Sequence, residues 1–197
     1  MLTEWGRKAL KPIFEFIASI FEKLHITPNA ITVLAFVLSL IVAYLIIIDQ
    51  LLWAGILYFL GAGLDAIDGT LARRVGVRSN FGAFLDSTLD RFGESTVTGA
   101  LIVWAALRGD MLGVFFAFTA LVTSFMVSYT RARAEGLGYE AKVGFGSRVE
   151  RFFIMVIALL FKQPIIGLAL ITLLAGITTI QRIYVVWKQA KAVMTED

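Results

Sequence analysis

Apolar residues fill six long stretches of the chain, and only short polar breaks separate them. We place the stretches at about Asn29–Ile48, Leu51–Arg73, Phe81–Leu107, Met111–Ala134, Arg148–Phe161 and Pro164–Trp187. A helix rises 1.5 Å per residue, so about 20 residues cross the ~30 Å hydrocarbon core of a bilayer. The pattern therefore predicts an all-α, polytopic membrane protein with six transmembrane helices.

Composition supports a membrane protein over a soluble one. The chain has 197 residues, of which 58% are hydrophobic, and its mean hydropathy is +0.81. These values are too apolar for a soluble domain of this size. The chain has no cysteine and one histidine, which excludes disulfides, Cys-bound zinc and a multi-His metal site.

The first 26 residues differ from the rest because charged and aromatic positions alternate in them. We predict that residues 1–26 form an amphipathic helix in the membrane interface, and that residues 27–197 form a six-helix bundle within the same single domain. His25 precedes Thr27-Pro28-Asn29, a typical helix start, so we expect a plain interfacial position for it.

The basic residues give the bundle an orientation. With six spans, only Arg108 and Lys162 of the 18 arginines and lysines fall on one side of the membrane. The positive-inside rule then predicts that the other side, which carries both termini, faces the cytoplasm. The net charge of +3 is explained by residues that flank apolar spans, so nucleic acid is not expected as a partner.

Four aspartates interrupt the second and third spans at a fixed spacing. Asp65 and Asp68 are three residues apart, and Asp86 and Asp90 are four apart, so each pair lies on one helix face. The chain reverses between the pairs, and the two faces can therefore meet near the cytoplasmic surface. Acids inside a membrane need a neutralising partner, and hard carboxylate oxygens suit Mg²⁺, Mn²⁺ or Ca²⁺. We therefore expect a membrane-embedded metalloenzyme.

The residues around these aspartates form a longer pattern. It reads Asp65-x-x-Asp68-Gly69-x-x-Ala72-Arg73, then eight residues, then Gly82-x-x-x-Asp86-x-x-x-Asp90. This pattern resembles the motif of the CDP-alcohol phosphatidyltransferases at every position. Six spans and an interfacial N-terminal helix are also similar to that family, so the resemblance covers nearly the whole chain.

The resemblance implies a reaction and a role for each motif residue. A CDP-linked lipid would donate its phosphatidyl group to an alcohol and release CMP. Asp65, Asp68, Asp86 and Asp90 would hold divalent metal, as two Mg²⁺ or Mn²⁺ ions. Asp90 would also be the catalytic base for the acceptor hydroxyl. The cytidine-diphosphate pocket would be lined by Asp68, Gly69, Ala72, Arg73 and Gly82. The resemblance also implies a homodimer.

Arginines near the cytoplasmic helix ends suggest an acceptor that carries a phosphate. Arg131, Arg148 and Arg151 lie at such ends, and Arg182 interrupts the last span. Arginine matches phosphate through its planar fork of donors. We predict that Arg131, Arg148, Arg151 and Arg182 bind the acceptor phosphate, whereas Arg133 and Lys142 are expected as ordinary positive-inside residues.

The sequence around these arginines is similar to the inositol-phosphate branch of the family, which includes phosphatidylinositol-phosphate and archaetidylinositol-phosphate synthases. One position departs from that branch, because Ser147 stands where a glutamate is expected. Glycerol 3-phosphate as acceptor, or CDP-inositol as donor, therefore stay open as alternatives.

Two other classes of membrane protein use intramembrane acids. Prenyltransferases carry Asp-rich motifs on two separate helix pairs, whereas this chain has one hairpin with interleaved glycine and arginine. Cation or proton transporters use acids near the bilayer midplane, whereas these cluster with Arg73 towards one surface. Both classes are weaker fits than the phosphatidyltransferase.

Overall fold

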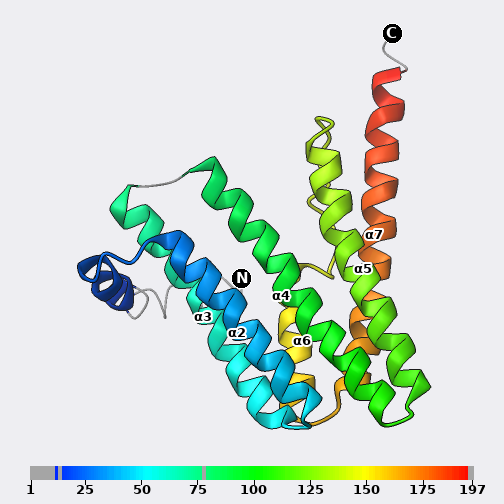
Figure 1. The fold of residues 1–197 in the computed structure, drawn as a ribbon. Coiled ribbons are helices and arrows are strands. Elements are labelled where there is room, and N and C mark those ends of the chain that lie inside the picture. The colour runs from blue at the N-terminus through cyan, green and yellow to red at the C-terminus, as the bar shows by residue number, and fades with distance from the viewer. Residues whose placement is uncertain (1–11, 13–14, 77–78, 195–197) are drawn as a thin grey trace. The chain divides into compact units, whose positions relative to one another are not determined.

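The chain is an all-helical protein over the residues that its computed structural model describes. These are residues 12, 15–76 and 79–194, with the side chains of all but 65, 66, 193 and 194. A helix at residues 15–23 precedes six longer ones (Figure 1). The six are α2 (Pro28–Ile47), α3 (Leu51–Val75), α4 (Asn80–Leu107), α5 (Met111–Glu135), α6 (Arg148–Leu160) and α7 (Pro164–Met194).

The helices match the apolar stretches of the sequence closely, which confirms the predicted helical class. The starts of α3, α5, α6 and α7 coincide with the predicted starts. The largest difference is at the end of α7, which continues past Trp187 to Met194. Its last turns contain Lys188 and Lys191, and charged residues do not stop a helix that good helix formers continue.

In the part of the chain that the structure describes, four helices are long and apolar enough to cross a membrane. They are α2, α3, α5 and the Pro164–Ala192 part of α7. Helix α6 has 13 residues, which corresponds to about 20 Å of helix. Helix α4 has 28 residues but carries four charged side chains within nine residues: Asp86, Asp90, Arg91 and Glu94.

The chain folds as two compact units. Unit 1 comprises the chain up to Val42 together with Ile56–Val97, and unit 2 comprises Ala43–Gly55 together with the chain from Thr98 onwards. Helices α2, α3 and α4 each run from one unit into the other. The single domain stays a prediction.

The core of unit 1 joins the first helix to α2 and α3. Ala18, Ile31, Ile67 and Leu71 are buried against one another, and Ile17, Phe21, Ile26 and Leu64 pack around them. At the edge of this cluster, Arg74 Nε donates to Glu22 Oε2 over 2.8 Å. The helix at residues 15–23 is thus anchored to α3. Half of the predicted N-terminal amphipathic helix, residues 1–11 with 13 and 14, lies outside the described residues.

Helix α4 packs on α2 within unit 1 through small and aromatic residues. A Cβ at Gly93 would lie 3.3 Å from Ser39 Oγ, so the glycine lets the two helices approach closely. One turn away in sequence, the rings of Phe36 and Phe92 meet edge to face with centroids 6.4 Å apart. These contacts place α4 beside the middle of α2.

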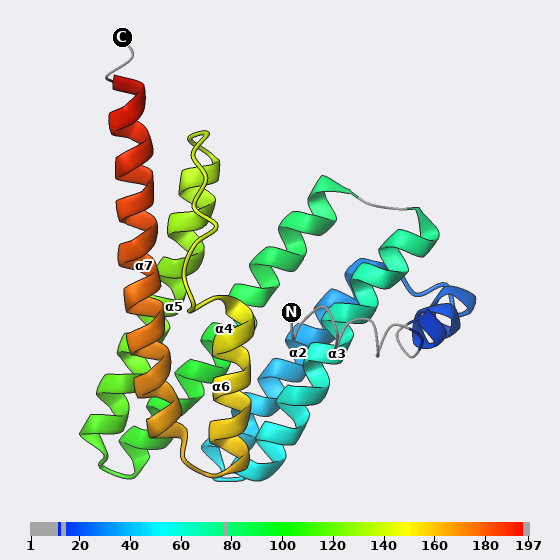
Figure 2. The ribbon, with the colours of Figure 1, turned by 180° about the vertical axis from the view of Figure 1, so that it is seen from behind.

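In unit 2, α7 lies along α5 and also contacts α6, as both views show (Figure 2). Asp49, in the turn between α2 and α3, joins that turn to the end of α4. Its carboxylate accepts from Trp104 Nε1 at 3.0 Å and pairs with Arg108 Nη2 at 2.6 Å. The Arg108 guanidinium also lies 4.2 Å from the centre of the Trp104 ring.

We predict that the cluster of unit 1 contributes strongly to stability. Leu71 is fully buried, and Leu71→Ala should lower the free energy of unfolding by ~2–5 kcal/mol because the cavity cannot collapse completely. Leu60→Ala, on the same helix but 59% exposed, is the matched control and should cost far less. Equilibrium unfolding in mixed micelles measures both, and equal losses would contradict this assignment of the core.

Candidate active site

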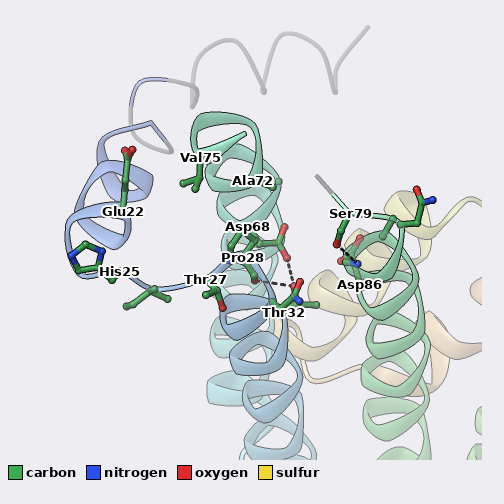
Figure 3. A pocket seen from close by; sticks show the side chains of 16 residues that line it. Glu22, His25, Thr27, Pro28, Thr32, Asp68, Ala72, Val75, Ser79 and Asp86 are labelled. Atoms are coloured by element: carbon green, nitrogen blue, oxygen red, sulfur yellow. Dashed lines mark hydrogen bonds between the residues drawn. The ribbon is translucent and has the colours of Figure 1, made fainter. Parts of the chain in front are cut away.

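A cavity of about 830 Å³ opens in unit 1 where α2 begins, α3 ends and α4 begins. Asp68, Gly69 and Ala72 of α3 line it, together with Gly82 and Asp86 of α4. Figure 3 shows Asp68 and Asp86 entering this pocket from two different helices. The structure therefore brings five of the motif residues to one cavity, although they come from two separate segments of the sequence.

Asp68 is held in place by a residue of α2. Its side chain is only 7% exposed, and Oδ2 accepts a hydrogen bond from Thr32 Oγ1 at 3.0 Å. The same hydroxyl lies 3.1 Å from the Pro28 carbonyl oxygen. A hydroxyl has one proton, and a charged carboxylate is the stronger acceptor, so the bond to Asp68 is favoured when that group is ionised.

The start of α4 forms the opposite wall. Ser79 Oγ accepts from Gly82 N at 2.9 Å, which satisfies one of the free N–H groups at this helix end. A Cβ at Gly82 would lie 3.1 Å from Ser79 Oγ and 3.2 Å from Asn29 Oδ1. Glycine at this position therefore leaves room for two polar atoms, and Asn29 and Ser79 also line the pocket.

The helix at residues 15–23 and the turn after it complete the lining with Glu22 and His25. His25 adopts a φ of 56°, a left-handed conformation that ends the helix and turns the chain towards α2. The sequence pattern did not assign Glu22, Asn29, Thr32 or Ser79 to a site. The sequence signal available for these residues was the helix start at Thr27-Pro28-Asn29, because it predicts where α2 begins.

Two motif residues lie beside the pocket lining rather than in it. Arg73 Nη2 donates to Thr70 Oγ1 at 2.9 Å on the exposed side of α3. Asp90 lies one turn beyond Asp86 on α4, with its Oδ2 3.7 Å from Arg91 Nη2. Asp65 is on α3, three residues before Asp68, and its side chain is outside the described part of the structure.

The predicted metal ligands are hard oxygen donors, which fits a divalent ion such as Mg²⁺ or Mn²⁺. Asp68 and Asp86 enter one cavity, so the donor chemistry of the pocket suits such an ion. Among the side chains that the structure describes, no group of three Asp, Glu or His residues is positioned to hold one ion. The full ligand set with Asp65 and Asp90 stays a prediction.

The predicted acceptor arginines all belong to unit 2. Arg151 of α6 and Arg182 of α7 are buried, with 2% and 5% of their surface exposed. Arg131 is exposed on α5 and pairs with Glu135 at 3.0 Å, and the charges of Arg131 and Arg151 both act on Arg182. Arg148 begins α6 and is half-buried. Three of the four arginines thus form one group of interacting charges.

Solved structures with a similar fold come from Mycobacterium tuberculosis. Its phosphatidylinositol phosphate synthase with CDP-DAG bound superposes with a TM-score of 0.84 at 30% identity, covering 89% of this chain and 94% of that one. The same synthase in complex with manganese and citrate gives a TM-score of 0.83 over 88% of both chains.

Two related synthases are similar to this chain over nearly the whole length of both proteins. The archaetidylinositol phosphate synthase of Pyrococcus horikoshii is 40% identical over 93% of this chain and 95% of its own. The phosphatidylinositol phosphate synthase of Cutibacterium acnes is 34% identical over 94% of this chain and 97% of its own. The sequence model for CDP-alcohol phosphatidyltransferase matches residues 25–188, which include every motif residue of the pocket. The chain belongs to the CDP-alcohol phosphatidyltransferase family.

Proposed function

We propose that this enzyme transfers a phosphatidyl or archaetidyl group from a CDP-linked lipid to a hydroxyl of inositol phosphate and releases CMP. The observation that carries this proposal is the pocket of unit 1, in which Asp68, Gly69, Ala72, Gly82 and Asp86 meet. Because the family is known, the prenyltransferase and transporter alternatives have no further support.

The proposed reaction is a substitution at the phosphorus that bears the lipid. The acceptor oxygen bonds to this phosphorus, the bond from phosphorus to the bridging diphosphate oxygen breaks, and CMP departs with the bonding electrons. Asp90 takes the proton of the acceptor hydroxyl, as a general base within hydrogen-bond reach would. Asp68, Gly69, Ala72, Arg73 and Gly82 hold the cytidine diphosphate beside it.

A divalent ion, or a pair of ions, would be held by Asp65, Asp68, Asp86 and Asp90. When bound, it neutralises the diphosphate and stabilises the attacking and leaving oxygens. Support comes from the carboxylate donors of the pocket and from the manganese in the mycobacterial structure. Thr32 would orient the Asp68 carboxylate towards the ion through its hydrogen bond to Oδ2.

The acceptor assignment rests on the arginines of unit 2. The positive charges of Arg131 and Arg151 both act unfavourably on the Arg182 guanidinium, and a bound phosphate would relieve that repulsion. The names of the Pyrococcus and Cutibacterium relatives favour inositol phosphate as the phosphate ester. Glycerol 3-phosphate as acceptor, and CDP-inositol as donor, are the alternatives that the same arginines could serve.

The membrane topology is also part of the proposal. Besides the four apolar helices, we place α4 and α6 in the membrane, with the charged first half of α4 turned to the pocket. Helix α6 spans with the help of local thinning or of the segment before it, because ~20 Å is shorter than the hydrocarbon core. The chain would lie in the cell membrane as a homodimer, with an interfacial N-terminal helix and the site facing the cytoplasm.

The acceptor assignment is tested by a screen with the purified enzyme in mixed micelles. With a CDP-linked lipid and Mg²⁺, radiolabelled inositol 1-phosphate should be converted to lipid much faster than glycerol 3-phosphate, serine or inositol. Excess EDTA should abolish the release of CMP, and added Mg²⁺ or Mn²⁺ should restore it. Preference for an unphosphorylated alcohol would contradict the acceptor, and full turnover in EDTA would contradict the metal.

The two roles of the aspartates should separate by mutation. Asp90→Asn removes the base, so turnover should fall by roughly 10²–10⁴-fold while binding of the CDP-lipid stays measurable. Asp68→Asn should weaken binding of both metal and CDP-lipid. Calorimetric titration of each variant with the CDP-lipid, beside turnover, distinguishes them. Equal loss of binding in both variants would make Asp90 chiefly a ligand.

Thr32→Val should reveal the contribution of the α2 hydroxyl. The substitution keeps the shape of the side chain but leaves Asp68 without one of its donors, so the metal concentration for half-maximal activity should rise by about 10–100-fold. Ser39→Ala on the same helix is the control, because Ser39 Oγ bonds only to the Phe36 carbonyl of its own helix. An unchanged metal requirement in Thr32→Val would mean that Asp68 is oriented without Thr32.

A further inference from the structure

The connection between α5 and α6 is a 12-residue loop, residues 136–147, without regular secondary structure. Such a loop has backbone N–H and C=O groups that no helix or sheet satisfies. Buried positions occur within it, because Ala141 is fully buried and Gly146 is buried as well. The backbone groups of this loop therefore need partners from elsewhere in unit 2.

The backbone N–H groups of residues 136–139 donate to carbonyls at the end of α5, and side chains of α7 bond to the loop from residue 140 onwards. Gln189 uses both ends of its amide on Glu140, accepting from the backbone N–H at 3.0 Å and donating to the carbonyl at 2.7 Å. Arg182 Nε donates to the Val143 carbonyl at 3.1 Å. Thr178 Oγ1 accepts from Gly146 N at 2.8 Å. The bonded loop residues Glu140, Val143 and Gly146 are three positions apart in sequence, so the loop runs along α7.

The three α7 residues share one face of the helix. At 100° per residue, positions 178, 182 and 189 fall within about 40° of each other around the axis. Thr178 is fully buried beneath the loop. We call residues 140–146 the strap, because this face of α7 holds their backbone along its length.

Two glycines allow the strap to lie so close. A Cβ at Gly146 would be 2.6 Å from the Leu174 carbonyl oxygen and 2.9 Å from Ala175 N, so no side chain fits there. Gly144 has a φ of 105°, which is open to glycine and strained for other residues. The backbone itself, rather than side chains of the loop, makes the contact with α7.

The strap is bonded to two of the arginines. Arg151 Nη1 donates to the Gly146 carbonyl at 2.7 Å, and Arg182 Nε donates to the Val143 carbonyl. Arg182 Nη1 also donates to the Val127 carbonyl of α5. These carbonyl oxygens help to orient the two guanidiniums, as groups behind a metal ligand orient the ligand.

We propose that Thr178 and Gln189 are positioning residues for the acceptor site, which hold the strap on α7 so that its carbonyls orient Arg151 and Arg182 towards the acceptor phosphate. This inference rests on the proposed function, since it takes the arginines as the phosphate-binding group. Without the strap, Arg151 would lose the Gly146 carbonyl and Arg182 would lose the Val143 carbonyl while keeping that of Val127, and like charges would drive the arginines apart. Neither Thr178 nor Gln189 needs to touch the substrate.

Two substitutions test the proposal on the full-length enzyme. Thr178→Val keeps the side-chain shape but removes the acceptor of Gly146 N, and Gln189→Leu removes both bonds to Glu140. Thr179→Val is the matched control for the first, because Thr179 Oγ1 bonds only to the Ala175 carbonyl of its own helix. Thr178→Ser keeps a hydroxyl and should restore the behaviour of the wild type.

The first readout is hydrogen exchange followed by mass spectrometry, which does not depend on activity. Peptides covering residues 139–147 should exchange roughly tenfold faster in Thr178→Val and Gln189→Leu, because the backbone groups of Gly146 or of Glu140 lose their side-chain partners. Thr179→Val and Thr178→Ser should exchange like the wild type. Unchanged exchange in both test variants would overturn the strap.

The second readout compares the change in KM for the acceptor with the change in KM for the CDP-lipid. We expect KM for inositol phosphate to rise about five- to tenfold in Thr178→Val and Gln189→Leu, with KM for the CDP-lipid within twofold of wild type. Faster exchange with both KM values unchanged, or both raised alike, would reduce the strap to a structural role. If the wild type does not use inositol phosphate, the proposed function fails, whereas the exchange data still decide whether Thr178 and Gln189 hold the loop.

Discussion

A carboxylate inside an apolar helical protein must be hydrogen-bonded, protonated or paired with a cation, and the pocket of unit 1 is organised around that requirement. Asp68 is almost completely buried and accepts a hydrogen bond from Thr32, while Asp86 enters the same cavity from α4. The rest of unit 1 serves this arrangement. The cluster around Leu71 anchors the first helix, and the Ser39–Gly93 contact positions α4 beside α2.

The buried arginines of unit 2 obey the same requirement with the opposite charge. Arg151 and Arg182 are placed against backbone carbonyls, which partly compensate their lost hydration without cancelling their charge. Carbonyl partners leave the guanidiniums positively charged, and an acceptor phosphate can pair with that charge. The contacts that stabilise the buried arginines are therefore compatible with substrate binding.

Irregular backbone in unit 2 is supported by side chains rather than by a sheet. The connection between α5 and α6 relies on Thr178, Arg182 and Gln189, which project from one face of α7. At the other end of the unit, Asp49 joins two turns through Trp104 and Arg108. Both devices satisfy polar groups locally, which matters in a protein that is surrounded by lipid, where water cannot supply the missing hydrogen bonds.

The sequence by itself determined the helices, because apolar runs between tight polar breaks leave few places for a helix to begin or end. Helices α3, α5, α6 and α7 start where the pattern predicts. It also indicated the family, since the residues from Asp65 to Asp90 resemble the motif of the family at every position. Contacts between distant segments were decided only by the tertiary structure. Thr32 meets Asp68 across 36 residues, and Gln189 meets Glu140 across 49. Threonine and glutamine are common on helices, so no local pattern distinguishes the one that meets a partner from those that face lipid or their own helix.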